Sequence, residues 1–275
     1  MLVLQEEDWD CGLACALMVL RALQYSMSSI QGGSGRRALP SMKELRERCE
    51  TQSIWTIDLA HLLRHYGVGV RMRTVFPGVD PSHQHSQFYK DVISQDQKRV
   101  TQLFRRAADA GISVERKGTT SSEMLSLVAD HGHVLIVLVD RTILLCDECA
   151  LADKAFAEKL KEFGSKADSF LGHFVVLTDI SQSRISTEKR NSDGGGSPNN
   201  NKALTDNFSN DLKSAAVPPV PTKGSKRAWF YDPGSRVENH QCSVPFDQFE
   251  KARLQSGTDQ DILIIKVNEQ KKPKS

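Results

Sequence analysis

The sequence predicts an α+β fold whose helices dominate the first half of the chain and whose strands gather in the second half. Apolar residues recur at three- and four-residue spacing over residues 11–24, which is typical of a long helix with one buried face. The second half instead carries short apolar runs of strand length, of which VLIVLV at 134–139 is the clearest. Helices that precede most of the strands, rather than alternating with them, favour an α+β architecture.

The first half of the chain is expected to add several shorter elements to this leading helix. Residues 68–76 alternate apolar and polar side chains, as a half-buried strand does. Thr120 and Glu123 have the spacing of a capping box, in which each side chain binds the backbone N–H of the other residue, so a helix is expected after them. The predicted helices are 42–49, 56–66, 98–110 and 121–130, and a short strand is predicted at 112–116.

The second half is expected to supply the centre of the sheet. Residues 134–139 form an uninterrupted apolar run, which is typical of a strand that is covered on both faces. Two further strands, 173–180 and 226–232, flank a long polar segment and are expected to pair in antiparallel fashion. A helix near 245–255 and an apolar strand at 262–267 complete the predicted fold.

The segment 181–225 differs from the rest of the chain because it is polar and has no apolar periodicity. It contains three glycines at 194–196, three asparagines at 199–201 and the run PPVP at 218–221. Such a composition cannot bury enough apolar surface to offset the entropy lost on folding, so the segment is expected to be disordered. The sequence therefore predicts one domain, 1–270, with a disordered insertion that is a candidate attachment point for a protein partner.

Composition and charge exclude several classes of protein. The 275 residues include 36 Lys and Arg against 34 Asp and Glu, a net charge of +2 that argues against a nucleic-acid partner. No apolar run approaches the ~18 residues of a membrane span, so no membrane partner is expected. The first residues lack the basic and apolar regions of a signal peptide, which predicts a cytoplasmic protein, with the nucleus as the alternative. Six cysteines are too few for a disulfide scaffold, so free thiols are expected.

Cys11 lies at the expected start of the first helix and is the strongest candidate for a nucleophile. A helix N-terminus favours negative charge, which lowers the pKa of a thiol there and raises its thiolate fraction. Asp10 is a candidate cap of this helix, and Gly12 removes side-chain bulk beside the sulfur. Gln5 carries an amide N–H group that is a candidate donor to a developing oxyanion, whereas Cys15, one turn later, is expected to pack inward.

A cysteine nucleophile needs a base and a group that orients the base, and His173 and Asp232 are the candidates for these roles. If the insertion only joins two paired strands, His173 at the start of one lies opposite Asp232 at the end of the other, with Cβ atoms ~4.5–5.5 Å apart. Taken singly, each residue also has a structural interpretation, as a core cysteine or a polar residue at a strand end. The combination is more specific than any of its members. The predicted catalytic residues are Gln5, Cys11, His173 and Asp232.

The segment around Cys11 resembles the start of the double-glycine-type cysteine peptidases, which have a papain-like fold. The resemblance rests on Gln5 and on the run WDCGLAC at 9–15. It implies that an N-terminal catalytic helix packs on an antiparallel sheet.

A longer series of blocks resembles one eukaryotic family, the guanylyl cyclase domain-containing proteins of animals and their guanylyl cyclase-like counterparts in plants. This resemblance also implies a papain-like fold, whereas the family name implies conversion of GTP to cyclic GMP. The blocks are WDCGLACALMVLRAL (9–23), SIWTIDLAHLLRHYGV (53–68), RVTQLFRRAADAGI (99–112), HVLIVLVD (133–140), GHFVVLTD (172–179), YDPGS (231–235) and SGTDQDILII (256–265).

The residues and the family name indicate different functions. The cysteine site favours a hydrolase or transferase that acts on a peptide, isopeptide or related amide and needs no cofactor. The family name implies a guanylyl cyclase, which takes GTP and a divalent metal, Mg²⁺ or Mn²⁺. A further alternative is an inactive papain-like scaffold that binds partners, and the intact set of catalytic residues argues against it.

Two pairs of residues are candidate metal ligands. Asp259 and Asp261 alternate at a strand start and would point to one face, but no phosphate-binding G-x-x-x-x-G-K-[ST] loop accompanies them, so a solvated turn is favoured. Cys146 and Cys149 form a C-x-x-C motif, half of a zinc site, without a second such pair in the sequence. Packed or exposed thiols are favoured there, and the sequence therefore predicts no metal site.

Overall fold

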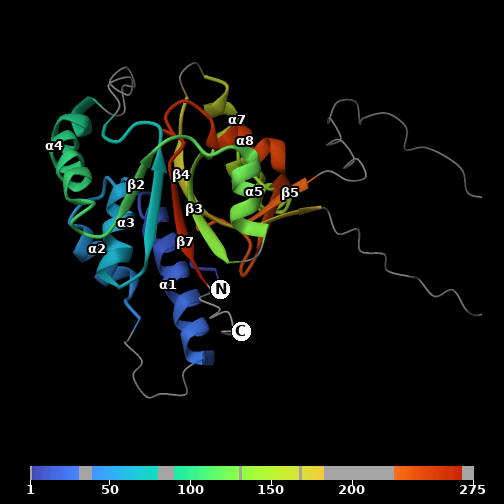
Figure 1. Cartoon of the computed structure of the whole chain (residues 1–275). Coiled ribbons are helices and arrows are strands. Elements are labelled where there is room, and N and C mark those ends of the chain that lie inside the picture. The colour runs from blue at the N-terminus through green and yellow to red at the C-terminus, as the bar shows by residue number, and fades with distance from the viewer. Residues whose placement is uncertain are drawn as a thin grey trace, which may run out of the picture.

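The computed structural model of the chain describes residues 2–30, 39–79, 90–129, 132–166, 169–182 and 226–267 (Figure 1). Within these ranges eight helices and seven strands form, and most of the strands follow the first helices along the chain. The expected α+β class is therefore confirmed. None of the helices in these ranges is long and apolar enough to cross a membrane.

One mixed sheet lies in the middle of the molecule. Its strands are β1 (Val70–Thr74), β2 (Ser113–Arg116), β3 (His133–Asp140), β4 (Gly172–Gln182), β5 (Lys226–Tyr231), β6 (Cys242–Pro245) and β7 (Ile262–Lys266). Their spatial order is β2-β1-β7-β3-β4-β5-β6. Only β1 and β2 are parallel, and each other pair of neighbours is antiparallel. The apolar strand β3 lies between β7 and β4, at the centre of the sheet, as the sequence predicts.

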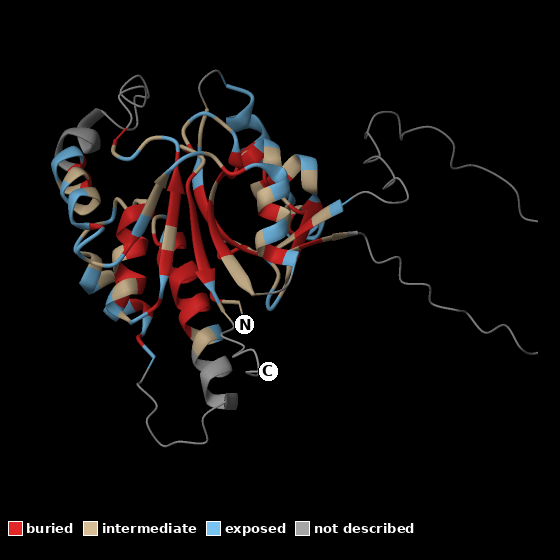
Figure 2. Cartoon of the chain, viewed as in Figure 1, coloured by how far each residue is buried: buried red, intermediate tan, exposed pale blue. Residues whose placement is uncertain are grey.

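Helices cover both faces of this sheet (Figure 1). One face packs against α1 (Cys11–Ile30), α2 (Met42–Cys49), α3 (Thr56–His65) and α4 (Lys90–Arg106). The other packs against α5 (Ser121–Ala129), α6 (Asp147–Ala152) and α8 (Phe246–Arg253), and α7 (Lys154–Gly164) follows α6 directly. Figure 2 shows that the strands between these two layers are largely buried.

The two faces of the sheet bury two separate apolar cores, and successive residues of one strand enter different cores. On β4, Phe174 and Val176 belong to the core under α1 and α3, whereas Val175 and Leu177 belong to the core under α5 and α8. Side chains that alternate across a strand explain this division. Because both faces are covered, both sets of positions must be apolar, which accounts for the uninterrupted apolar runs in the sequence.

Helix α1 packs unusually close to its neighbours at its first turn. A Cβ atom at Gly12 would lie 2.9 Å from Leu59 Cδ1 and 3.0 Å from Phe174 Cδ2, so a larger residue would push the helix away from α3 and β4. One turn later, the Cys15 thiol is fully buried and donates to the backbone carbonyl of Phe174 at 3.3 Å. The inward packing expected for Cys15 is confirmed, and these contacts hold the start of α1 against β4.

Local sequence signals are confirmed at several helix ends. Helix α1 begins at Cys11 and α2 spans the expected residues 42–49. At the start of α5 the backbone N–H of Glu123 donates to Thr120 Oγ1 at 3.2 Å, and that of Thr120 donates to Glu123 Oε2 at 3.0 Å. The capping box is therefore present as predicted.

Some boundaries and elements differ from the prediction. Strand β6 and helices α6 and α7 form in stretches for which the sequence analysis expected no element. Ser181 and Gln182 pair with Arg227 and Lys226, so the strand continues into the first residues of the predicted insertion. The rest of that insertion, 183–225, lies outside the described residues.

The strand alternation offered for Asp259 and Asp261 is wrong, whereas the turn favoured over it is present at Asp259. Asp259 and Gln260 adopt left-handed backbone conformations, with φ of 48° and 52°, and β7 begins only at Ile262. The two aspartates therefore lie in a turn and do not share a strand face. Asp261 is buried, with 7% of its surface exposed, so the solvated turn favoured from the sequence is also wrong for this residue.

Candidate active site

Cys11 is the first residue of α1 and lies against the start of β4. Its side chain is mostly buried, with 7% of the residue exposed. The His173 side chain and the backbone N–H of Phe174 lie close enough to the thiol to stabilise its charged form and lower its pKa. Because α1 is anchored on β4 through Gly12 and Cys15, the sulfur and the imidazole are held together by packing of the two elements.

His173 and Asp232 form a buried pair, with His173 Nε2 2.7 Å from Asp232 Oδ1. His173 is the second residue of β4, and Asp232 directly follows the last residue of β5. Their exposed fractions are 3% and 5%. Asp232 Oδ1 also accepts the backbone N–H of Gly234 at 2.7 Å, which fixes the orientation of the carboxylate in the turn after β5.

The strand register differs from the expected one. His173 and Asp232 are not direct cross-strand neighbours, because β4 and β5 pair Val176 with Tyr231 and His173 pairs with Val139 on β3. If the pairing of β4 with β5 continued for one more residue, Asp232 would lie opposite Val175. The carboxylate and the imidazole are therefore diagonal neighbours, which long side chains bridge. A β-bulge between Leu177 and Asp179 shifts the register, and the sequence gives no sign of it.

The surroundings of Cys11 favour its thiolate. Burial alone disfavours the charged form, but His173, the Phe174 backbone N–H and Arg141 outweigh it, so the pKa of Cys11 is lower than that of an ordinary thiol. Its position at the N-terminus of α1 acts in the same direction, because the helix dipole stabilises negative charge there.

His173 is correspondingly poised to carry a proton. Burial and the nearby Arg141 cation disfavour the imidazolium, yet Asp232 and Cys11 outweigh them and raise the pKa of His173 above its ordinary value. Burial also opposes ionisation of Asp232, but the His173 and Arg141 charges lower the pKa of this carboxyl to about 2. The site therefore combines an ionised carboxylate, a basic imidazole and an acidic thiol.

Arg141 is a residue of this site that the sequence analysis missed. It directly follows β3 and is buried, with 8% of its surface exposed. Its guanidinium donates to the carbonyl of Gly234 at 2.8 Å and lies 3.5 Å from His173 Nδ1 and 3.9 Å from Asp232 Oδ2. The available signal in the sequence was a cationic residue placed directly after the apolar run of β3.

Gln5 and Asp10, which precede Cys11 in the sequence, form hydrogen bonds with the segment that leads into α1. Gln5 Nε2 donates to the carbonyl of Glu7 at 3.0 Å, and the Gln5 backbone N–H donates to the carbonyl of Pro233 at 2.8 Å. The Asp10 side chain does not cap α1 as expected. It accepts the backbone N–H groups of Glu6 and Glu7, both at 3.2 Å, and forms an ion pair with Arg46, so it fixes the segment that leads into the helix.

A second group of thiols lies at the far end of the β5–β6 loop. Cys146, Cys149, His240 and Cys242 bring their ligand atoms within 4.8 Å of one another, so the two cysteines of the C-x-x-C motif are not isolated. Within the part of the chain that the structure describes, no other group of three or more His, Cys, Asp or Glu residues converges in this way.

Comparison with known proteins gives one family. The sequence profile of a family described as guanylylate cyclase matches residues 1–217. The protein Guanylyl cyclase 1 of Arabidopsis thaliana is 34% identical over 175 residues, which are 63% of this chain and 57% of that relative. The chain thus matches little more than half the length of this relative. No solved structure shows significant similarity to this one.

Proposed function

The chain belongs to the guanylylate cyclase family, and we propose that this protein is a thiol-dependent hydrolase or transferase with a papain-like core. The observations that support this most directly are the 2.7 Å contact between His173 and Asp232 and the pKa of the Cys11 thiol, which His173 lowers. A nucleophile, a base and a group that orients the base are the parts that thiol catalysis requires.

The contacts of the imidazole assign its two nitrogens. Nε2 faces Asp232 and acts as the donor to the carboxylate. Nδ1 is then the nitrogen that exchanges a proton with the Cys11 thiol, and it does so beside the Arg141 guanidinium, which lies 3.5 Å from it. Asp232 is held in turn by the Gly234 backbone N–H, so the imidazole is fixed in one tautomer and one orientation.

Acyl transfer then proceeds in two steps. The Cys11 thiolate attacks the carbonyl carbon of an amide, a C–S bond forms, and the C–N bond breaks as His173 donates its proton to the departing nitrogen. Water in a hydrolase, or an amine in a transferase, gives a proton to His173 and attacks the thioester, which releases Cys11. The substrate class is a peptide, an isopeptide or a related amide.

Gln5 and Arg141 have supporting roles in this proposal. Gln5 supplies an amide N–H group to the oxyanion after it releases the carbonyl of Glu7. Arg141 positions the site, because its contacts with Gly234 and Asp232 hold the turn that carries the carboxylate. The small exposed fraction of Cys11, 7%, favours a slender substrate segment or a small molecule.

Guanylyl cyclase activity is the second candidate, favoured by the family description and by the name of the Arabidopsis relative. This activity would convert GTP to cyclic GMP with Mg²⁺ or Mn²⁺, and it assigns no role to the Cys11 thiol. The two candidates therefore differ in whether Cys11 or a divalent metal is essential.

Site-resolved alkylation tests the thiol site without knowledge of the substrate. Cys49 is the matched control: it is more exposed than Cys11, but burial and the Asp58 carboxylate raise its pKa to about 12. We expect iodoacetamide to modify Cys11 at least about tenfold faster than Cys49 at pH 7, since only the thiolate reacts. Reaction at Cys11 no faster than at Cys49 would overturn the proposal.

A pair of activity assays separates the two candidates. Wild-type protein should release product from fluorogenic amide or isopeptide substrates, and the Cys11→Ala variant should not. GTP should give no cyclic GMP in either protein with Mg²⁺ or Mn²⁺. Metal-dependent cyclic GMP formation that survives in Cys11→Ala would instead establish the second candidate and remove the first.

A further inference from the structure

The three cysteines of the far cluster come from two separate parts of the chain. Cys146 and Cys149 flank the start of α6, and Cys242 begins β6, while His240 lies just before β6. Cys146, Cys149 and Cys242 are buried, with 1–3% of each residue exposed, and His240 is partly exposed. None of the three is in a disulfide.

The separations of the ligand atoms fit one tetrahedral ion. Cys149 Sγ lies 3.6 Å from Cys242 Sγ, and Cys146 Sγ lies 3.7 Å from His240 Nε2. With Zn–S bonds of about 2.3 Å, the edges of a tetrahedral site are about 3.7 Å long. All four atoms lie within 4.8 Å of one another, a spread that suits a single ion better than a two-iron cluster.

The backbone around the C-x-x-C motif supports negative charge on its sulfurs. The backbone N–H of Cys149 donates to Cys146 Sγ at 3.4 Å, so Cys146 caps the start of α6 through its sulfur. Ser235 Oγ lies 3.4 Å from Cys149 Sγ, which places a hydroxyl from the β5–β6 loop beside a second ligand. Polar contacts of this kind around ligand atoms orient a metal site.

The alternatives explain less of this arrangement. A disulfide between Cys149 and Cys242 would need sulfurs about 2.05 Å apart and would leave Cys146 and His240 without a role. Simple packing of thiols explains burial of the cysteines, and the Glu148 carboxylate, 3.8 Å from His240 Nε2, gives the imidazole a second partner. Neither explains why three sulfurs and this nitrogen converge within 4.8 Å of one another. Three sulfurs and one imidazole are the ligand set of a closed structural zinc site.

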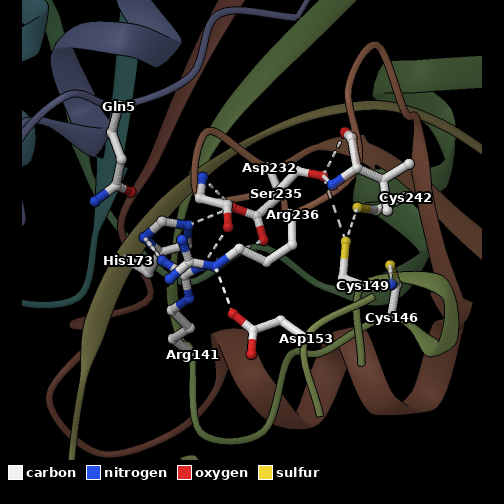
Figure 3. A network of polar contacts seen from close by, with 12 residues as sticks. Gln5, Arg141, Cys146, Cys149, Asp153, His173, Asp232, Ser235, Arg236 and Cys242 are labelled. Atoms are coloured by element: carbon white, nitrogen blue, oxygen red, sulfur yellow. Dashed lines mark hydrogen bonds and ion pairs between the residues drawn. The ribbon is translucent and has the colours of Figure 1, made fainter. Parts of the chain in front are cut away.

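We propose that Cys146, Cys149, His240 and Cys242 bind one structural Zn²⁺ that joins α6 to the β5–β6 loop. All four positions of the ion are filled by protein, so this centre does no chemistry on a substrate. Its role is to hold the loop whose first residue is Asp232. Figure 3 shows that Asp232, Ser235 and Arg236 lie between His173 and the three cysteines. The Arg236–Asp153 ion pair at 3.5 Å adds a second tie between the same two segments.

Metal analysis of the full chain tests the proposal independently of any activity. Protein produced in zinc-supplemented medium and purified under reducing conditions should contain one Zn²⁺ per chain. After exchange into Co²⁺, it should show the visible absorption of tetrahedral cobalt together with thiolate-to-cobalt charge-transfer bands. Folded protein without stoichiometric metal and without these bands would overturn the proposal, as would iron in place of zinc or a Cys149–Cys242 disulfide.

Variants assign the ligands. His240→Ala is the most informative, because His240 is partly exposed and its loss need not disrupt the core; Zn²⁺ should bind at least tenfold more weakly. His240→Cys should restore tight binding, since four thiolates also form a structural zinc site. Cys242→Ser should lose the thiolate-to-cobalt bands in part, whereas the control Cys49→Ser should change neither metal content nor spectrum. Full zinc affinity in His240→Ala would contradict the assignment.

Discussion

The two cysteine sites of this molecule lie at opposite ends of one loop and differ in what surrounds the sulfur. Cys11 is a single thiol with an imidazole, and that imidazole faces the carboxylate of Asp232 at 2.7 Å. The far cluster has three thiols and one imidazole, with sulfur 3.6 Å from sulfur. The first set has the groups that proton transfer requires, whereas the second has the ligand atoms that bind one metal cation.

The comparison shows that burial of a cysteine does not decide its chemistry. Cys11, Cys15 and Cys149 all have exposed fractions of 7% or less. Cys15 donates to a backbone carbonyl, and burial together with the nearby negative charges of Cys11 and Asp232 raises its pKa, so it is an inert core thiol. The partners of each sulfur, rather than its depth, therefore separate the proposed nucleophile, the proposed metal ligand and the packing residue.

The largest expected effect comes from removing the nucleophile. Cys11→Ala should lower turnover of amide substrates by at least about 10³-fold, because no other group in the site can form the thioester. Its zinc content, measured by mass spectrometry of the metal, should stay at the wild-type value, since Cys11 does not belong to the far cluster. Loss of zinc together with turnover would show that the two sites are not separate.

Removing the base should have the next largest effect. His173→Ala should lower turnover by about 10²–10⁴-fold, the range for general acid–base catalysis. It should also move the midpoint of Cys11 alkylation to higher pH, because the imidazole is one of the groups that lower the pKa of Cys11. An unchanged pH midpoint in the variant would mean that the histidine does not act on the thiol.

Asp232→Asn tests the buried pair through stability. The folded protein lowers the pKa of Asp232 from 3.8 to about 2, so the ionised carboxylate stabilises the fold above pH 3.8 and this contribution is lost as pH falls toward 2. The variant should be less stable than wild type by about 2 kcal/mol near neutral pH. Denaturant titrations should show that the difference shrinks in acid, and a difference independent of pH would contradict this assignment.

Gly234→Ala should give the smallest effect and tests Arg141. A Cβ atom at Gly234 would overlap the Arg141 guanidinium, so the cation must leave the turn after β5. We expect a loss of stability of about 1–2 kcal/mol. Gly132→Ala is the control, because a Cβ atom there has open space around it. Equal stability of the two variants in thermal unfolding would show that the Arg141 contact does not stabilise the fold.

Much of the fold could be predicted because it follows from local patterns. The apolar spacing of α1, the Thr120–Glu123 capping box and the apolar run of β3 each depend on residues within a few positions of one another. The turn favoured at Asp259 is a local feature too, because left-handed backbone at Asp259 and Gln260 ends the loop just before β7.

The residues proposed for the site could also be selected from the sequence, but the distances between them could not be predicted from it. Selection of His173 and Asp232 rested on their places at strand ends, and the structure brings them together through a register two residues away from the expected one. A β-bulge between Leu177 and Asp179 changes the register by one residue and brings Asp232 one position nearer His173, and no residue pattern gives a reliable signal for it. Arg141 was not predicted as a site residue because its distance from His173 depends on the pairing of β3 with β4.

The sequence by itself determined where α1, α2, α5 and β3 lie, because capping and apolar spacing act between near neighbours along the chain. It also determined that Cys11 starts a helix, and hence that its thiol lies near a positive dipole end. Only the tertiary structure decided which distant residues meet. Cys146 and Cys242 lie almost a hundred positions apart, and their approach depends on the order of the strands in the sheet. A ligand set assembled across such a separation leaves no periodic trace in the sequence, since its geometry is fixed by packing of whole elements.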